Sequence, residues 1–389
     1  MPASEASAAA VPPAFERPVY LTRPLLPPLE TYTDVLRGIW ERHWLTNGGP
    51  LHDALEHALC DRLRVAHLSL VSNWTTALIL ACRALGLAGE VVTTPFTSPA
   101  TVHALAWCGL TPVFADIDPI ALTLDPAAVE RAITARTSAI VGVHIYGMPC
   151  DVAAMQHIAD RHGLRVIYDG AHTFGTEIAN EPVLRFGDAT IMSFHATKLF
   201  NTAEGGAVVV HDRQFKQRVD TLRNLGIQDE VTVAASGINA KMSEFAAALG
   251  LTNLELVEAE CVARADLAEI YGARLSGMTG LSCFAIPSHI RDSRNYFVLR
   301  IDGERSPISR DDLYEGLKRF NVFGRRYFYP LCSEFPPYRD LPSADPRALR
   351  IAHRAAREVL CVPFYGDLGG VAAHRICDMI AYLWSSALR

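Results

Sequence analysis

Short apolar runs alternate with helical patterns over residues 64–169, and this alternation limits the possible fold more than any other feature. The apolar runs are VAHLSLVS, EVVTTPF, TPVFADI, SAIVGVHIYG and RVIYDGA, separated by helical patterns at 75–87, 99–108, 126–134 and 151–162. Such a pattern is typical of a parallel sheet covered by helices on both faces. Two more strands, ATIMSF and GAVVVH, follow without a helix between them. We therefore expect an α/β fold with a mostly parallel sheet of seven strands.

The pattern changes after residue 240. A helical pattern covers 243–275, a candidate strand YFVLRI follows, and further helical patterns cover 310–320 and 370–387. This arrangement favours a smaller α+β domain that the long helical segment joins to the first domain. The prediction divides the chain into a flexible tail (1–15), a large α/β domain (16–255) and a small C-terminal α+β domain (256–389).

Composition narrows the class of partner. The chain has 36 basic and 42 acidic residues, a net charge of -6 and no long run of either sign, which argues against binding nucleic acid. Nine cysteines without metal-ligand spacing fit a reducing cytoplasm and predict no metal site. No apolar stretch approaches the roughly 18 residues of a membrane span, and the Ala/Ser/Pro-rich start does not resemble a signal peptide. We expect a cytoplasmic protein that acts on small molecules.

Polar side chains follow five of the predicted strands. In open α/β sheets, ligands bind at the carboxyl ends of the strands, so these side chains should converge on one crevice. They occupy the segments Ser72 to Thr75, Phe96 to Ser98, Tyr146 to Gly147, Asp169 to His172 and Ser193 to Lys198.

The first of these segments, SNWTT, precedes an apolar helix. Free N–H groups and the positive end of the helix dipole make such a turn an anion site, well suited to phosphate. An ordinary helix cap explains the same residues equally well. The glycines of dinucleotide-binding and P-loop motifs are absent, so neither kind of site is predicted.

Taken alone, Asp169 and Lys198 could each have either a structural or a chemical role. Asp169, after the apolar run RVIY, could cap a helix, join a salt bridge or keep a pyridinium nitrogen protonated. Most lysines are solvated, but Lys198 lies near the hydroxyls of Ser193 and Thr197 and before the apolar strand GAVVV. A lysine near phosphate donors and a carboxylate meets the needs of an enzyme that holds an aldehyde cofactor covalently.

These motifs together resemble a known family. YDGAHTFGT, followed 29 positions after its Asp by the Lys of SFHATKLFNTAEGGAVV, is similar to the DegT/DnrJ/StrS sugar-nucleotide aminotransferases, which use pyridoxal 5'-phosphate. The segments WLTNGGPLH, TTPFTSPAT, GINAKMSE and GRRYFYPL fall in the expected order. The resemblance implies the aspartate-aminotransferase-like fold, type I of the transferases that depend on this cofactor.

The resemblance also implies roles for the cofactor site. Lys198 would attach the cofactor and later move a proton between the cofactor and substrate carbons. Asp169 would pair with the ring nitrogen, His172 would approach the ring hydroxyl, and Ala171 would pack on a ring face. Asn73, Trp74, Thr75 and Ser193 would hold the phosphate. Asn239 of a second subunit would complete that phosphate site, so a homodimer is implied, with pyridoxamine 5'-phosphate as the aminated form of the cofactor.

Two positions depart from the family pattern. The phosphate turn usually reads Gly-Thr, where this chain has Trp74-Thr75. Ser98 stands where relatives commonly place an aromatic residue that stacks on the ring, an interaction worth roughly 0.5–1.5 kcal/mol. Ser98 stays in the predicted cofactor site, and we expect another group to cover that face.

The predicted sugar-nucleotide site is drawn from two further segments and two strand-end residues. Arg325, Arg326 and Tyr329 offer guanidinium groups for a pyrophosphate and a ring for the base or sugar. The two arginines could instead pair with carboxylates at the domain junction. The set is completed by Asn47, Tyr146 and His195.

The resemblance implies a specific reaction. L-glutamate would give its amino group to carbon 4 of dTDP-4-keto-6-deoxy-D-glucose, although glutamine as donor and carbon 3 of an isomeric keto-sugar stay open. A sugar dehydratase of the same fold would carry histidine in place of Lys198. A non-catalytic regulator would not need both Asp169 and Lys198, and an oxidoreductase with a Rossmann fold would need the missing glycine motif.

Overall fold

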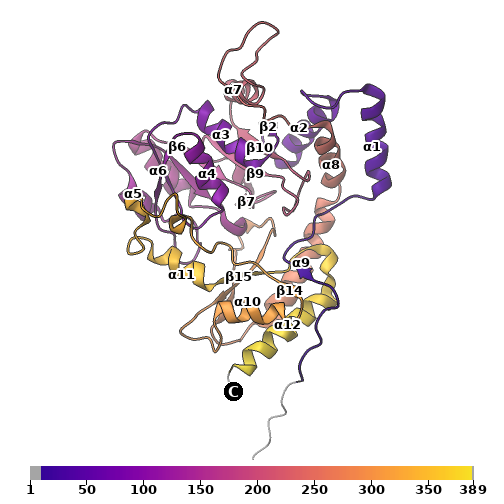
Figure 1. Cartoon of the computed structure of the whole chain (residues 1–389), viewed down its shortest axis with the longest axis vertical. Coiled ribbons are helices and arrows are strands. Elements are labelled where there is room, and N and C mark those ends of the chain that lie inside the picture. Colours follow the sequence, from indigo (N-terminus) through magenta and orange to yellow (C-terminus); the bar gives the residue numbers. More distant parts are fainter. Residues whose placement is uncertain (1–9, 388–389) are drawn as a thin grey trace, which may run out of the picture.

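The computed structural model describes residues 10–387 and contains the predicted α/β sheet. Seven strands lie in the order β2-β10-β9-β6-β5-β3-β4, and β10 alone runs antiparallel to its two neighbours. Their bounds are β2 His67–Val71, β3 Glu90–Thr93, β4 Thr111–Phe114, β5 Thr137–Val143, β6 Arg165–Asp169, β9 Ala189–Ser193 and β10 Gly206–Val210. Figure 1 labels β2, β10, β9 and β6 of this sheet. The prediction of a mostly parallel seven-stranded sheet is confirmed.

Alternate residues of each strand pack on opposite faces of this sheet. Val141 and Ile167 contact the layer formed by α3 (Trp74–Ala84), α4 (Pro99–Trp107) and α7 (Arg213–Arg223). Ile140 and Val166 face the other layer. That layer consists of α5 (Pro126–Ala132), α6 (Val152–His162), α2 (Pro50–Leu63) and α8 (Glu244–Leu254). Burial on both faces explains why the strand sequences are continuously apolar.

The C-terminal region forms a second, smaller layer structure. A three-stranded antiparallel sheet in the order β11-β13-β15 packs against helices. Its elements are β11 Leu281–Cys283, β13 Phe297–Ile301, β15 Val359–Val362, α9 Val257–Leu275, α10 Arg310–Lys318, α11 Arg350–Glu358 and α12 Gly369–Ser386. Figure 1 labels β15 and the helices α9, α10, α11 and α12 of this region. A separate small sheet joins β12 Ile290–Arg291 to β7 Glu177–Ile178 and β8 Glu181–Pro182.

The helical pattern over 243–275 is not one helix. The structure breaks it into α8 and α9, with Glu255 and Leu256 between them. The Thr252 hydroxyl donates to carbonyls of its own last turn, and the Asn253 side chain donates inward to the Asn201 carbonyl. Side chains that compete for such bonds weaken a helix end. The proposed domain boundary at 255/256 falls at this break and stays a prediction.

The segment that precedes the large sheet contacts the C-terminal region. Strand β1 (Val19–Tyr20) pairs in parallel with β14 (Val322–Phe323), and the Phe15 amide donates to the Phe320 carbonyl at 3.0 Å. Of the predicted tail, residues 1–9 lie outside the described residues. The described residues 10–387 contain no helix that is long and apolar enough to cross a membrane.

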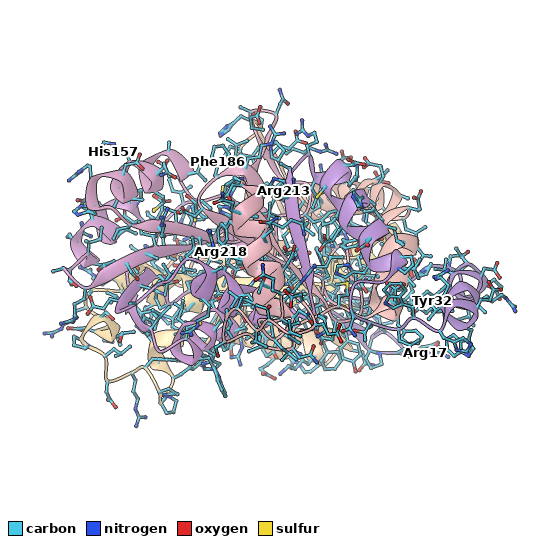
Figure 2. The ribbon with its side chains drawn as sticks, turned by 90° about the horizontal axis from the view of Figure 1, so that it is seen from above. Arg17, Tyr32, His157, Phe186, Arg213 and Arg218 are labelled. Atoms are coloured by element: carbon cyan, nitrogen blue, oxygen red, sulfur yellow. The ribbon has the colours of Figure 1, made fainter. Side chains whose placement is uncertain are left out.

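Helix α1 (Leu29–Arg42) stands at the edge of the molecule. Figure 2 shows Tyr32 of α1 at the opposite end from His157 of α6. Ile39 is the only buried residue of α1, and the Tyr32 hydroxyl donates to the Phe245 carbonyl of α8 at 3.0 Å. The Trp40 ring meets the Phe245 ring of α8 edge-on, with centres 5.8 Å apart, but the side chains of Leu29 and Trp40 remain largely exposed.

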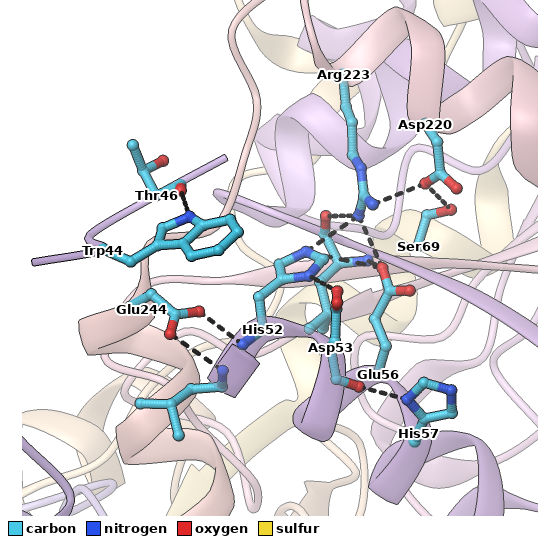
Figure 3. A network of polar contacts seen from close by, with 12 residues as sticks. Trp44, Thr46, His52, Asp53, Glu56, His57, Ser69, Asp220, Arg223 and Glu244 are labelled. Atoms are coloured by element: carbon cyan, nitrogen blue, oxygen red, sulfur yellow. Dashed lines mark hydrogen bonds and ion pairs between the residues drawn. The ribbon is translucent and has the colours of Figure 1, made fainter. Parts of the chain in front are cut away.

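A polar network ties α2 and α7 to the edge strand β2 (Figure 3). Arg223 donates to the Glu56 carboxylate at 2.8 Å and to the Leu70 carbonyl at 2.6 Å. Burial opposes ionisation of Glu56, but Arg223 and Lys216 outweigh it and lower its pKa to about 2. The Arg223 carbonyl accepts from the Ala240 amide, so this network holds the base of the 224–240 loop beside β2.

Candidate active site

A cavity of about 540 Å³ opens at the carboxyl ends of the parallel strands, where the sequence predicts the site. We call it the strand-end cavity. It brings together most of the predicted site residues: Asn73, Trp74, Thr75, Ser98, Asp169, Ala171, His172, Ser193, His195, Lys198, Arg326 and Tyr329. The convergence follows from the sheet, because parallel strands present all their carboxyl ends to the same edge.

The turn after β2 begins helix α3. The Asn73 side chain accepts from the Thr76 amide at 2.9 Å, which makes it the cap of the helix. That cap leaves the amides at the start of α3 available to an anion. An added Cβ on Gly206 would lie 2.8 Å from the Asn73 carbonyl carbon, so glycine lets β10 pass beneath this turn. The cap and the anion site suggested by the sequence are therefore compatible.

The Asp169 carboxylate is buried at the end of β6. One oxygen accepts from the Ala171 amide at 3.0 Å, and the other accepts from the Thr101 hydroxyl at 3.1 Å. Burial raises the pKa of Asp169 to about 6, although these bonds and the charge of Lys198 oppose the shift. A carboxylate buried in this way needs a cationic partner to stay ionised.

The Lys198 amine is also removed from water. Burial lowers the pKa of Lys198 to about 8, while Asp169 and then Tyr327 act in the opposite direction. The Lys198 amide donates to the His195 carbonyl, which places the lysine in a tight turn after β9. A lysine with a lowered pKa carries a substantial neutral fraction near pH 7, as a nucleophilic amine requires.

His172 lines the cavity in a defined protonation state. Its Nδ1 accepts from the Tyr146 amide at 3.1 Å, so the ring proton of the neutral imidazole is on Nε2. Burial, followed by the charge of Lys198, lowers the pKa of His172 well below its usual value. The neutral ring therefore offers a fixed N–H donor.

Ser193 and His195 lie on the turn that carries Lys198. The Ser193 hydroxyl accepts from the His195 amide at 3.4 Å, and His195 Nδ1 accepts from the Thr197 amide at 3.2 Å. His195 Nε2 lies 3.6 Å from Glu204. These contacts organise the loop and leave the Ser193 hydroxyl at the cavity wall.

Ser98 caps a helix, and aromatic side chains line other parts of the wall. The Ser98 hydroxyl accepts from the Ala100 amide of α4 at 3.4 Å. Trp74, Tyr327, Phe328 and Phe335 all line the cavity. The Trp74 indole Nε1 is buried and makes no hydrogen bond within the described residues, although it lies near enough to lower the pKa of Asp169.

The arginine pair separates at the cavity mouth. Arg326 lines the cavity and donates to Asp311 at 2.9 Å, and its guanidinium lies 5.0 Å from the ring centre of Tyr329. Arg325 is exposed and joins the backbone of Cys361. Arg326 therefore pairs with a carboxylate, as one of the two suggestions had it, and also lines the cavity; its use for a pyrophosphate stays a prediction.

Four predicted site residues do not line the strand-end cavity: Asn47, Tyr146, Arg325 and Asn239. Tyr146 is buried behind His172, and its hydroxyl donates to the Tyr327 carbonyl. Asn47 and Asn239 are exposed, and Asn239 bridges to Asn224 at the base of the 224–240 loop. Their predicted roles stay predictions.

The sequence did not single out several residues of the wall. Tyr296, from the segment before β13, places its hydroxyl 3.3 Å from the Lys198 amine. Thr101 bonds Asp169, and Tyr327 and Phe328 come from the loop after β14. The sequence RNYFVLRI gives no local sign that its tyrosine belongs to the site, because the position of Tyr296 depends on how the C-terminal region packs against the large sheet.

The donor set fits a phosphorylated pyridine aldehyde. The structure offers a buried carboxylate that lacks a full cationic partner, an amine with a substantial neutral fraction and helix amides for a phosphate. These groups line one cavity, and the unpartnered Trp74 indole N–H lies in the same wall. Among residues 10–387, no group of three or more His, Cys, Asp or Glu side chains could hold a metal ion.

Comparisons with known proteins agree with this interpretation. A model of the DegT/DnrJ/EryC1/StrS aminotransferase family matches residues 30–381. The dTDP-4-amino-4,6-dideoxy-D-glucose transaminase of Shigella dysenteriae is 43% identical over 373 residues, which cover 96% of this chain and 99% of the relative. The Escherichia coli protein of the same name is 44% identical over 370 residues, which cover 94% and 98%.

Solved structures show the same relationship. The crystal structure of DesI in the presence of its TDP-sugar product matches with a TM-score of 0.92 and 39% identity, covering 97% of this chain and 95% of DesI. Helicobacter pylori PseC, an aminotransferase involved in the biosynthesis of pseudoaminic acid, matches with a TM-score of 0.88 and 25% identity, covering 95% and 100%. Aminotransferases of this kind depend on pyridoxal 5'-phosphate. The chain belongs to the DegT/DnrJ/EryC1/StrS aminotransferase family.

Proposed function

We propose that the protein transfers an amino group from L-glutamate to carbon 4 of dTDP-4-keto-6-deoxy-D-glucose, giving dTDP-4-amino-4,6-dideoxy-D-glucose and 2-oxoglutarate. The observation that carries the chemistry is the convergence of the Lys198 amine and the Asp169 carboxylate on one cavity. The choice of sugar is supported by two relatives named for this product and by the resemblance to DesI. Amination at carbon 3 is the alternative that the experiment must separate.

The cofactor, when bound, supplies an electron sink that makes loss of a proton from the neighbouring substrate carbon possible. Asp169 would hold the positive charge of the ring nitrogen, because a buried carboxylate and a pyridinium satisfy each other. The neutral His172 would donate from Nε2 toward the ring hydroxyl. The amides at the start of α3, with Thr75 and Ser193, would bind the phosphate.

Lys198 would attach the cofactor and then move protons. The Lys198 amine, when free, would be the base that removes a proton from one carbon and returns it to the other. Its lowered pKa suits both directions of transfer near neutral pH. Arg326 and Tyr329 would face the nucleotide part of the substrate at the cavity mouth.

A direct assay tests the reaction. Purified protein, loaded with cofactor, is incubated with L-glutamate or L-glutamine and with either dTDP-4-keto-6-deoxy-D-glucose or a dTDP-3-keto-6-deoxyhexose. We expect 2-oxoglutarate and a product whose NMR spectrum places the amine at carbon 4. Turnover only with the carbon 3 ketone would overturn the choice of sugar, and turnover only with glutamine would overturn the choice of donor.

We further propose that the enzyme works as a homodimer whose active sites lie at the subunit interface. The support is the 224–240 loop, which projects from the body beyond α7 (Figure 1) and carries exposed Val231 and Val233. Asn239 at its base is exposed and lies outside the strand-end cavity of its own subunit. By the family pattern, Asn239 would complete the phosphate site in the cavity of the second subunit.

Mixed dimers provide a test of that arrangement. The Lys198→Ala protein should be inactive because it lacks the amine, and the Asn239→Ala protein should be weakly active because it holds phosphate poorly. After equal mixing and subunit exchange, about a quarter of all sites should combine both native residues, and activity should rise accordingly. Size-exclusion chromatography with light scattering gives the oligomeric state. Mixtures that are no more active than their components would show that Asn239 does not act across the interface.

The Trp74 indole is our candidate for covering the ring face that Ser98 leaves open. Binding of pyridoxal 5'-phosphate should quench the fluorescence of Trp74, and Trp74→Phe should remove most of that quenching. Trp74→Ala should weaken cofactor binding about tenfold, because an aromatic contact of roughly 0.5–1.5 kcal/mol is lost together with buried area. Exposed Trp107 is the matched control, and its replacement by phenylalanine should leave the quenching unchanged. Undiminished quenching in Trp74→Phe would contradict the assignment.

A further inference from the structure

The Tyr296 hydroxyl is the one hydrogen-bond partner of the Lys198 amine within the described residues, at a distance of 3.3 Å. The amine lies 5.5 Å from the centre of the Tyr296 ring, so it sits beyond the hydroxyl end of the ring and not over its face. Burial keeps the tyrosine neutral by raising its pKa. A neutral phenol can accept from an ammonium group and can donate to a free amine, so it can serve Lys198 in both protonation states.

The Tyr296 side chain is held by packing on several sides. Its ring meets the His172 ring edge-on, with centres 4.9 Å apart and planes at 87°, and meets the Tyr327 ring at 5.7 Å and 74°. The residue is 7% exposed. A side chain locked by neighbours in this way can fix the position of a flexible lysine with little loss of further rotamer freedom.

The backbone around Tyr296 is anchored to the lysine turn and to helix α9. The Asn295 side chain accepts from the Leu199 amide at 3.0 Å, directly after Lys198. The buried Arg264 of α9 donates to the Asn295 carbonyl at 3.3 Å and to the Arg294 carbonyl at 3.1 Å. Glu260 binds Arg264 at 2.7 Å. A chain of contacts thus runs from α9 to the lysine amine.

We propose that Tyr296 is a positioning residue that holds the free Lys198 amine against the cavity during the part of the cycle in which the amine is not attached to the cofactor. Four other groups lie near the same amine. They are Asp169 from β6, His172 after that strand, Tyr327 from the loop after β14, and the turn that carries Lys198. Among the described residues, Tyr296 rather than any of these four is hydrogen-bonded to the amine. The inference rests on the proposed role of Lys198 as the attachment point.

Removing only the hydroxyl tests the proposal. In Tyr296→Phe the ring and its packing are kept, but the ammonium form of Lys198 loses its acceptor. The phenol can bond both forms of the amine, but its bond to the charged form is the stronger because it is charge-assisted, so the loss of the hydroxyl should lower the pKa of the amine by about one unit. Attachment of pyridoxal 5'-phosphate to the cofactor-free protein requires the neutral amine. Its rate, followed by visible absorbance between pH 6 and 9, should therefore reach its midpoint about one unit lower than in the native protein.

Turnover should change in a separate way. A mispositioned amine slows proton transfer, so kcat of Tyr296→Phe should fall roughly 10- to 100-fold while KM for the amino donor stays within about twofold. Tyr271→Phe is the matched control. It also removes a buried, hydrogen-bonded tyrosine hydroxyl of the small domain, whose partner is the Pro363 carbonyl at 2.9 Å, but it lies away from Lys198. Its attachment midpoint and kcat should match those of the native protein.

The possible results distinguish the positioning role of Tyr296 from the proposed role of Lys198. A shifted midpoint in Tyr296→Phe but not in Tyr271→Phe supports the positioning role. An unshifted midpoint, or the same shift in both variants, overturns it while leaving the proposed reaction intact. If Lys198→Ala still attaches the cofactor, the role of Lys198 fails and the inference about Tyr296 fails with it. Circular dichroism confirms that each variant is folded before its rates are compared.

Discussion

Replacing Lys198 with alanine should abolish both turnover and the colour of the cofactor-loaded protein. The buried amine serves two tasks that no other group of the cavity wall can perform together, covalent attachment and proton transfer between two carbons. We expect kcat/KM to fall at least about 10⁴-fold, the upper end of what a positioned general base contributes. The protein should still fold, since alanine fills part of a cavity wall rather than a core position.

The measurement combines spectroscopy with turnover. Visible absorbance and mass spectrometry after borohydride reduction would locate the attached cofactor, and the release of 2-oxoglutarate would give the rate. Lys318→Ala is the control, because that amine pairs with Glu315 on the outside of α10. Retention of a reducible adduct in Lys198→Ala would show that another amine carries the cofactor.

Replacing Asp169 with asparagine should reduce turnover but stabilise the cofactor-free protein. An amide cannot balance the charge of the ring nitrogen, so the cofactor loses its capacity to accept electrons and kcat should fall roughly 10³-fold or more. The geometry should survive, because an asparagine can still accept from the Ala171 amide and can meet the Thr101 hydroxyl with reversed polarity.

The stability effect follows from the raised pKa of Asp169. A carboxyl group whose pKa is about 6 in the folded protein and about 4 in the unfolded chain favours folding only while it is protonated. That contribution is present below pH 4 and is lost as pH rises through 6, which costs about 2–3 kcal/mol at pH 8. Asp169→Asn should therefore raise the free energy of unfolding of the cofactor-free protein at pH 8 and leave it nearly unchanged at pH 4.

Asp292 offers a matched control for this effect. Burial raises its pKa to about 6 as well, but it does not line the strand-end cavity. Asp292→Asn should give a similar stability gain at pH 8 with native turnover. Denaturant unfolding at the two pH values, on protein freed of cofactor, makes the comparison. A loss of stability at pH 8 in Asp169→Asn would mean that the charged carboxylate is better satisfied than its burial implies.

The sheet and the centre of the site could be predicted from the sequence because both depend on local patterns. Strands buried on two faces read as continuous apolar runs, and the residues after them must share one edge. Asp169, His172, Ser193 and Lys198 therefore met in the cavity as expected. The capped turn at Asn73 was recognisable because a polar cap before an apolar helix is a local signal.

The remainder of the site depends on packing between regions distant in sequence. Tyr296 lies about a hundred residues after Lys198, and Tyr327 and Phe328 come later still. No periodicity indicates which loop of the C-terminal region will lie against the edge of the large sheet. The same limit applies to Tyr146, which follows a strand as expected but turns away behind His172, and to the break between α8 and α9, which depends on where Asn253 finds its partner.

The pairing of β1 with β14 bears on how the polypeptide matures on the ribosome. Strand β1 emerges early, yet its partner is synthesised roughly three hundred residues later, so the amino-terminal segment must wait for most of translation before it can dock. A shortened chain that starts after Tyr20 would lack β1, and one that stops before Val322 would lack β14, so either would lose the β1–β14 pairing. Truncation from either end of the chain would thus remove the same β1–β14 pairing, although its two strands are far apart in the sequence.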